Sequence, residues 1–138
     1  MGLVLVIDDE PALREVARQF LEEAGHTVVE AGDGKVGLWI FRELRPDLAI
    51  VDLFMPEKEG VETIREMRAV DPAAKIVAMS GGGRFGTRQL LDGLVDLGAT
   101  ATLAKPFGHA ELLKAVNCAM NGPPGRKEQP SRDYCCTI

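Results

Sequence analysis

Short runs of aliphatic residues alternate with amphipathic segments through most of this chain, and this alternation limits the possible folds more than any other feature. Several of the runs are continuously apolar, which is typical of strands buried on both faces of a sheet. The segments between them repeat apolar residues at steps of three and four, which is the period of a helix. Strands are expected at residues 3–7, 27–31, 48–51, 75–79 and 101–104. Helices are expected at residues 11–24, 35–44, 59–70, 87–97 and 109–121.

Five strand–helix repeats predict an α/β fold in which helices cover both faces of a parallel sheet. Because crossovers between parallel strands are right-handed, the sheet is expected to be doubly wound. The aromatic side chains of Phe20, Trp39 and Phe41 are expected in the core. From Gly122 onward the chain is rich in Pro, Gly and charge. Residues 1–121 are therefore expected to form one domain, and residues 122–138 a flexible tail or linker.

Composition and charge exclude several classes of function. The net charge is −5 with acids and bases interspersed, so the chain has no basic footprint for nucleic acid or an anionic membrane. No apolar stretch has the length of a bilayer span, and acids by position 8 argue against a signal peptide. The three cysteines are too few and too badly spaced for a disulfide framework or a zinc site. A reducing, cytoplasmic location is therefore expected.

Polar side chains follow four of the five expected strands. Asp8 and Asp9 end the first strand, Asp52 the third, Ser80 the fourth and Lys105 the fifth. Ligands of doubly wound sheets bind outside the carboxyl ends of the strands, so these groups converge if their strands are neighbours. Three carboxylates suit a hard cation such as Mg²⁺. With a lysine and a hydroxyl, the set is suited to a phosphoryl group, which Asp52 could accept as an acyl phosphate.

Simpler explanations exist for each motif taken alone. Asp8 and Asp9 are acceptable N-caps for a helix that begins at Pro11. Asp52 could cap a turn, and the serine and lysine could be ordinary surface groups. A G-x-G-x-x-G pattern also occurs, formed by Gly81, Gly83 and Gly86. It follows the fourth strand rather than the first, and the next strand ends in a lysine instead of an acid, which disfavours a dinucleotide site.

Four motifs occur in a specific order and spacing: IDDE at 7–10, VDLFMP at 51–56 with Gly60 after it, MSG at 79–81 and GATATLAKPF at 98–107. In these motifs the chain resembles the response-regulator receiver domains, the family of the single-domain chemotaxis regulators. The resemblance extends from about residue 3 to residue 121. It implies a flavodoxin-like five-stranded parallel sheet with five helices and the strand order 2-1-3-4-5.

The resemblance also implies a role for each matching residue. Asp52 would be the phosphoacceptor, and Mg²⁺ (or Mn²⁺) would be the cofactor. The metal ligands would be Asp8, Asp9, Asp52 and the backbone carbonyl of Phe54. The phosphoryl group would be contacted by the Ser80 hydroxyl, the Gly81 backbone and the Lys105 amine. Members of the family usually have a cis bond at the position of Lys105–Pro106.

A receiver takes its phosphoryl group from a sensor histidine kinase or a phosphotransfer protein. The resemblance implies such a partner, and a downstream protein target or output domain that is reached by protein–protein contact, without direct contact to nucleic acid or membrane. Self-catalysed phosphotransfer and slow autodephosphorylation are expected in place of enzymatic turnover. Three matters stay open: the identity of the partners, whether the chain stands alone or is part of a longer protein, and whether phosphorylation produces a homodimer.

Two other functions compete with this interpretation. An interaction module could retain the acidic pocket without being phosphorylated. An aspartate-nucleophile phosphatase would use a second acid two residues after the nucleophile, and Phe54 occupies that position here.

The chain departs from the family at three places. Thr102 stands where an aromatic residue usually reports phosphorylation, so an aromatic rotamer switch cannot operate there. Neither Phe54 nor Gly82 can orient an attacking water, which predicts slow self-dephosphorylation. The glycine-rich stretch 81–86 is about three residues longer than the usual loop, and its glycines permit large backbone movement. The main conformational change is expected in that stretch.

Overall fold

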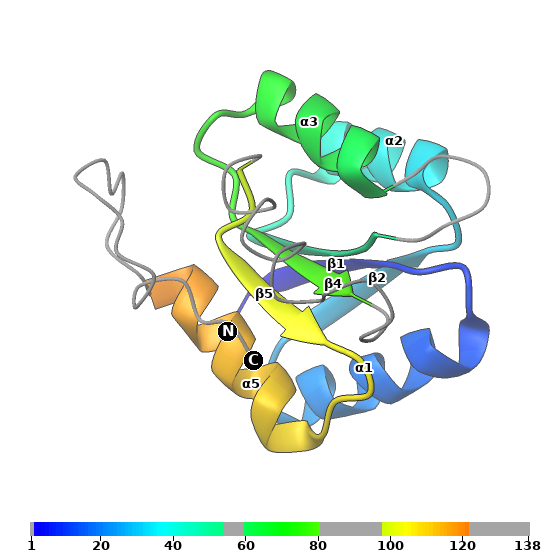
Figure 1. Cartoon of the computed structure of the whole chain (residues 1–138), viewed down its shortest axis with the longest axis vertical. Helices are drawn as coiled ribbons and strands as arrows, with labels where there is room; N and C mark the ends of the chain where they lie inside the picture. Colours follow the sequence, from blue (N-terminus) through cyan, green and yellow to red (C-terminus); the bar gives the residue numbers. More distant parts are fainter. Residues whose placement is uncertain (1, 54–59, 81–97, 122–138) are drawn as a thin grey trace.

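Five parallel strands form a single sheet in the order β2-β1-β3-β4-β5 (Figure 1). The computed structural model describes residues 2–53, 60–80 and 98–121. The strands are β1 (Leu3–Ile7), β2 (Thr27–Ala31), β3 (Leu48–Asp52), β4 (Ile76–Ser80) and β5 (Ala101–Ala104). Both the α/β class and the expected strand order are confirmed, and the strand bounds differ from the expected ones by one residue at most.

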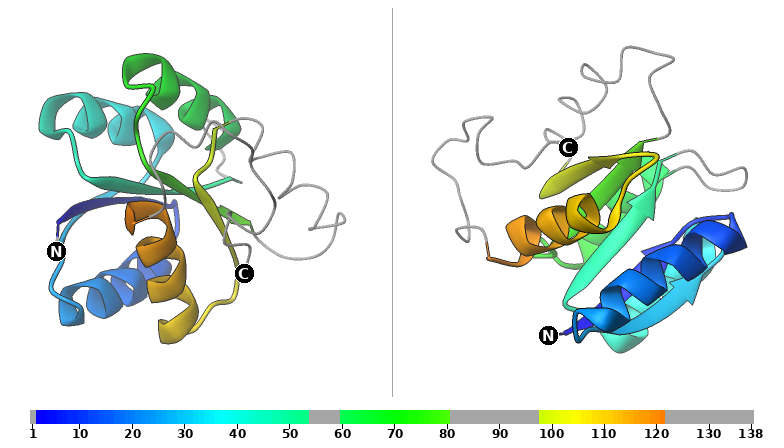
Figure 2. Two further views of the ribbon diagram at one scale, coloured as in Figure 1. Left: turned by 90° about the vertical axis from the view of Figure 1, so that its left-hand side faces the viewer. Right: turned by 90° about the horizontal axis from the view of Figure 1, so that it is seen from below.

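Helices cover both faces of the sheet. The described helices are α1 (Pro11–Glu23), α2 (Gly34–Leu44), α3 (Gly60–Val70) and α5 (His109–Asn121). In Figure 2, left, α2 and α3 lie on one face and α1 and α5 on the other. The helix expected at 87–97 and the tail expected at 122–138 fall outside the described residues. None of the helices in the described ranges is both long enough and apolar enough to cross a membrane.

Two apolar cores result from this arrangement, one on each face of the sheet. On β1, Leu5 and Ile7 pack toward α2 and α3, whereas Val4 and Val6 pack toward α1 and α5. Because successive side chains of a strand point to opposite faces, a strand covered on both sides must be apolar throughout. This requirement explains the continuous aliphatic runs in the sequence.

The expected positions of the aromatic side chains are only partly confirmed. Phe41 is buried, but the prediction for Trp39 is wrong, because this side chain is 62% exposed. Leu38, Ile40 and Phe41 occupy the inner face of α2, and Trp39 lies on the opposite side of the same helix turn. Phe20 is half-buried and meets the His109 ring edge-on, which joins α1 to α5. The spacing of the cysteines predicts no disulfide framework, and here the structure differs: the half-buried Cys118 of α5 is disulfide-bonded.

Candidate functional site

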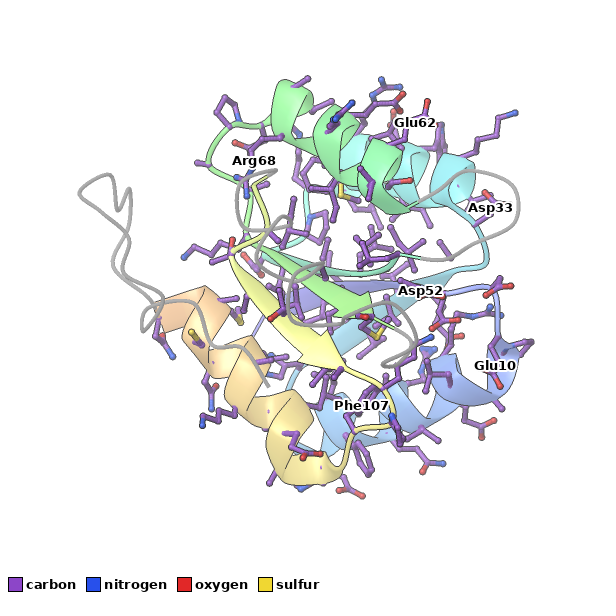
Figure 3. All side chains as sticks on the ribbon, viewed as in Figure 1. Glu10, Asp33, Asp52, Glu62, Arg68 and Phe107 are labelled. Carbon is purple, nitrogen blue, oxygen red and sulfur yellow. The ribbon has the colours of Figure 1, made fainter. Side chains whose placement is uncertain are left out.

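Three aspartates meet at the carboxyl end of the sheet, where β1 and β3 lie side by side. Ile7, the last residue of β1, pairs with Val51, so Asp8 and Asp9 follow the strand beside Asp52. One carboxylate oxygen from each aspartate lies within 4.8 Å of the other two. Asp8 and Asp52 are almost fully buried, and Asp9 is exposed. Figure 3 shows Asp52 at this end of the sheet.

The Lys105 amine provides the positive charge that faces these acids. Lys105 follows β5 and reaches across β4, because Ala104 pairs with Ser80 and Met79 pairs with Asp52. Its Nζ lies 2.9 Å from Oδ2 of Asp8 and 3.3 Å from Oδ2 of Asp52. Burial lowers the pKa of Lys105, but the hydrogen bond to Asp8 and the nearby carboxylate charges outweigh it and raise the pKa above its ordinary value. The Lys105–Pro106 peptide bond is cis, as expected.

Asp8 is held in place by several hydrogen bonds. Its backbone N–H donates to the Ala31 carbonyl of β2. Its Oδ1 accepts a hydrogen bond from the backbone N–H of Glu10 at 2.9 Å, and Arg14 of α1 donates to its carbonyl oxygen at 2.7 Å. Glu10 is the N-cap residue of α1, so Asp8 does not cap this helix in the usual way. With Oδ1 engaged by the backbone, Oδ2 is directed to Lys105.

Ser80 contributes a buried hydroxyl at the end of the neighbouring strand. Ser80 is 1% exposed, and its Oγ has no hydrogen-bond partner among the described residues. Its carbonyl oxygen accepts a hydrogen bond from the backbone N–H of Lys105 at 2.8 Å, which holds the ends of β4 and β5 together. Leaving a buried hydroxyl unpaired costs about 1–3 kcal/mol, so this group is suited to a ligand that supplies an acceptor.

Gly60 allows α3 to begin directly against the end of β3. A Cβ atom at this position would collide with the Asp52 carbonyl oxygen and would lie 2.5 Å from the Leu53 Cα. Only glycine therefore permits this close approach, which places the start of α3 beside the acidic cluster. Three predictions concern Phe54, Gly81 and the glycine-rich stretch 81–86, and all three fall outside the described residues.

Acidic side chains predominate in the cluster around Asp52. Within the described part of the chain, three carboxyl groups of this cluster gather around one lysine amine, so its acidic side chains outnumber its basic one. Carboxylate oxygens are the ligands that a small divalent cation such as Mg²⁺ prefers. The donor set therefore fits Mg²⁺, and Asp9 keeps the cluster in contact with solvent.

Comparison with known proteins agrees with this geometry. The family model of the response regulator receiver domain matches residues 4–117. The chain belongs to this family. Over 121 residues it is 34% identical to protein CcdB of Bacillus subtilis, which covers 87% of this chain and 98% of that protein. Over 115 residues it is 31% identical to the chemotaxis protein CheY of Thermotoga maritima, covering 83% of this chain and 93% of that protein.

A solved structure shows the same fold. The response regulator receiver domain protein of Clostridium thermocellum superimposes with a TM-score of 0.80 at 30% sequence identity, covering 88% of this chain and 95% of that one. The chain is therefore a receiver domain of two-component signalling, a class of signalling domain rather than of turnover enzyme.

Sequence reasoning missed the charged network of α1 and β2 that supports Asp8. Arg14 bonds both the Asp8 carbonyl and Glu30, and Arg18 bonds Glu30 at 2.6 Å. These residues lie up to 16 positions apart in the chain, and arginines and glutamates on a helix and an edge strand are usually interpreted as solvated. Only the packing of α1 against β2 reveals that they form a network.

Proposed function

We propose that Asp52 accepts a phosphoryl group from the phosphohistidine of a sensor histidine kinase or a phosphotransfer protein. The observation that carries this proposal is the meeting of Asp52 with Asp8, Asp9 and Lys105 beside a buried Ser80 hydroxyl that has no described partner. A carboxylate next to a lysine and an unpaired hydroxyl is arranged to become an acyl phosphate.

In the transfer, a carboxylate oxygen of Asp52 attacks phosphorus, the O–P bond forms and the N–P bond of the phosphohistidine breaks. The imidazole leaves with the electron pair of that bond. The new phosphoryl oxygens accept hydrogen bonds from the Lys105 amine and the Ser80 hydroxyl, and we assign a further backbone contact to Gly81. Lys105 then shares its charge between the phosphoryl group and Asp8.

The metal is assigned to the same cluster. Mg²⁺ held by Asp8, Asp9, Asp52 and the Phe54 carbonyl would neutralise phosphoryl oxygens as charge accumulates on them. Support for this assignment comes from the three aspartates, each of which offers a carboxylate oxygen within 4.8 Å of those of the other two. Mn²⁺ prefers similar ligands and is expected to substitute.

The signal is then passed on by protein–protein contact. The proposal assigns the receiver to residues 1–121, with residues 122–138 as a tail or linker, and places the protein in the cytoplasm. A net charge of −5 gives no support for direct binding to nucleic acid. The recipient is a separate target protein or an output domain.

Intact-protein mass spectrometry after incubation with Mg²⁺ and acetyl phosphate tests the proposal. We expect the mass of one phosphoryl group to be gained by the wild type, and no gain in the Asp52→Asn variant or in a chelated sample. A gain that persists in Asp52→Asn would overturn the assignment of the acceptor. No gain with acetyl phosphate or with a phosphorylated histidine donor would favour an unphosphorylated interaction module. Multiple turnover of a small phosphate ester would favour the phosphatase.

A further inference from the structure

The outer face of α2 exposes a tryptophan that no described element covers. Trp39 is 62% exposed, and Val36, one turn earlier, is 45% exposed. In Figure 2, left, α2 lies at the outer side of its layer, with α3 next to it. An isolated exposed apolar residue is ordinary, but tryptophan carries a large apolar area and is among the residues most enriched in interface hot spots.

Four exposed side chains surround Trp39 on this face. On a helix the neighbours of a residue lie three and four positions away. For Trp39 these neighbours are Lys35, Val36, Arg42 and Glu43, and all four are exposed. Within the described part of the chain, none of the three charged neighbours forms an ion pair. We call these five residues the α2 face.

Two of the three charges of the α2 face, those of Lys35 and Glu43, are complementary to each other under a two-fold rotation. A two-fold axis through Trp39, perpendicular to the helix, brings a second α2 alongside in antiparallel orientation. The residue four positions before Trp39 in one copy then faces the residue four positions after it in the other. Lys35 therefore faces Glu43 of the second copy, and Glu43 faces Lys35, so two opposite-charge pairs form. The residues three positions before and after Trp39 face each other in the same way, so Val36 of one copy faces the aliphatic stem of Arg42 of the other, which suits an apolar neighbour.

We propose that two copies of this chain associate through the α2 face, with the two Trp39 rings in contact on a two-fold axis. This surface is separate from the acidic site, and the association requires no phosphoryl group. An acidic segment of another protein would be attracted by Lys35 and Arg42 but repelled by Glu43. For a second copy the same Glu43 is an attractive group.

The size of the α2 face sets the expected affinity. An 11-residue helix is about 16 Å long, and one such contact buries less area than a standard stable interface. We expect a reversible dimer with a dissociation constant between about 10 µM and 1 mM. Trp39 is the only tryptophan of the chain, so its fluorescence reports this contact without interference.

The experiment measures self-association between about 10 µM and 2 mM by sedimentation, together with tryptophan emission, in the absence of any phosphodonor. For the wild type we expect a concentration-dependent dimer and a shift of the emission to shorter wavelength as Trp39 loses contact with water. Trp39→Ala should dimerise at least tenfold more weakly. Asp52→Asn should dimerise like the wild type, which separates this proposal from the proposed phosphotransfer.

Charge reversal tests the orientation of the two helices. Lys35→Glu places two acids in opposition at each pair, and Glu43→Lys places two bases in opposition, so each variant alone should dimerise at least tenfold more weakly. An equal mixture of the two variants restores both opposite-charge pairs and should associate like the wild type. Lys114→Glu makes the same charge change on an exposed position of α5 and should have no effect. All of these positions are exposed, and circular dichroism checks that each variant is folded.

Three results would overturn the proposal: a monomeric wild type with unchanged emission up to 2 mM, a mixture that associates no better than its components, or a dimer that survives Trp39→Ala. Binding of the monomer to an acidic peptide, strengthened by Glu43→Lys, would assign the α2 face to another protein instead.

Discussion

Lys105 is one ammonium group shared between two buried carboxylates, Asp8 and Asp52. Replacing it by methionine keeps much of the apolar stem but removes the ammonium group that contacts both acids. Without metal at pH 7, we expect Lys105→Met to lower the free energy of unfolding by about 1.5–3 kcal/mol, the range for a hydrogen bond to a charged group. Urea denaturation with a chelator measures this difference.

The pH dependence of that difference has a definite sign. The pKa of Lys105 is raised in the folded state above its ordinary value of 10.5. Its stabilising effect is therefore fully present below pH 10.5 and is lost as the pH rises through the folded-state pKa. The wild type and Lys105→Met should converge in stability above that pH. A difference that widens in alkali would contradict the ion-pair geometry.

Thr102 offers a second test at the level of one side chain. It is fully buried on β5, and its hydroxyl has no hydrogen-bond partner in the described part of the chain. Thr102→Val keeps the shape and removes the unpaired hydroxyl, so we expect the protein to gain about 1 kcal/mol in urea denaturation. Thr63 is the matched control. It is equally buried, but it takes part in an interaction, and its hydroxyl is not among the buried groups without a hydrogen-bond partner. Thr63→Val should be neutral or destabilising, and the same gain in both variants would show that hydrogen bonding is not the cause.

At the scale of single elements, the junction of β3 and α3 depends on the absence of a side chain at Gly60. The Asp52 and Leu53 backbones block a Cβ at this position, and backbone cannot move aside as a flexible side chain can. We expect Gly60→Ala to lower the free energy of unfolding by about 2 kcal/mol or more. Gly32→Ala is the control, since its Cβ would meet only the Arg14 guanidinium at 3.6 Å, an ordinary contact. Equal effects of the two substitutions in urea denaturation would argue against steric blocking at Gly60.

The contact between α1 and β2 depends on a charged network. Glu30 of β2 accepts hydrogen bonds from Arg14 at 2.9 Å and from Arg18 at 2.6 Å. Burial raises the pKa of Glu30, but the two arginines outweigh it and hold the pKa below its ordinary value of 4.5. Because the network is partly exposed, we expect Glu30→Gln to cost only about 1 kcal/mol.

This cost should depend on pH in the opposite direction to that of Lys105. A carboxylate with a lowered folded-state pKa stabilises the protein above its unfolded pKa, and this contribution is lost as the pH falls through the folded value. The difference between wild type and Glu30→Gln should hold from pH 7 to about pH 4.5 and vanish below. Unfolding curves at several pH values measure it, and a difference that persists at pH 2 would rule out the ion pairs as its source.

At the scale of the whole molecule, most of the fold and of the candidate site could be predicted, for a physical reason. In a doubly wound sheet, strands are recognised by their apolar runs, and the residues after them must lie at one edge. Asp8, Asp52 and Lys105 could therefore be brought together from the sequence alone. The exposure of Trp39 could not be predicted from the sequence, because the helical period defines a face only approximately and a large aromatic residue is usually assigned to the core. The hydrogen bond between Arg14 and Glu30 could not be predicted either, since it depends on how α1 and β2 pack against each other.

Binding of Mg²⁺ at the proposed site of three aspartates should make the stability of the whole chain depend on divalent metal. A ligand that binds only the folded state stabilises it by RT ln(1 + [L]/Kd), so above the dissociation constant each tenfold rise in free Mg²⁺ should add about 1.4 kcal/mol. We expect this slope in urea unfolding of the wild type. Asp8→Asn removes one carboxylate of the cluster and should flatten it. Sodium chloride at matched ionic strength screens repulsion without occupying a site, so it should produce only a small rise that levels off. An equal slope with sodium, or an unchanged slope in Asp8→Asn, would mean that the metal acts by general screening and not at the three aspartates.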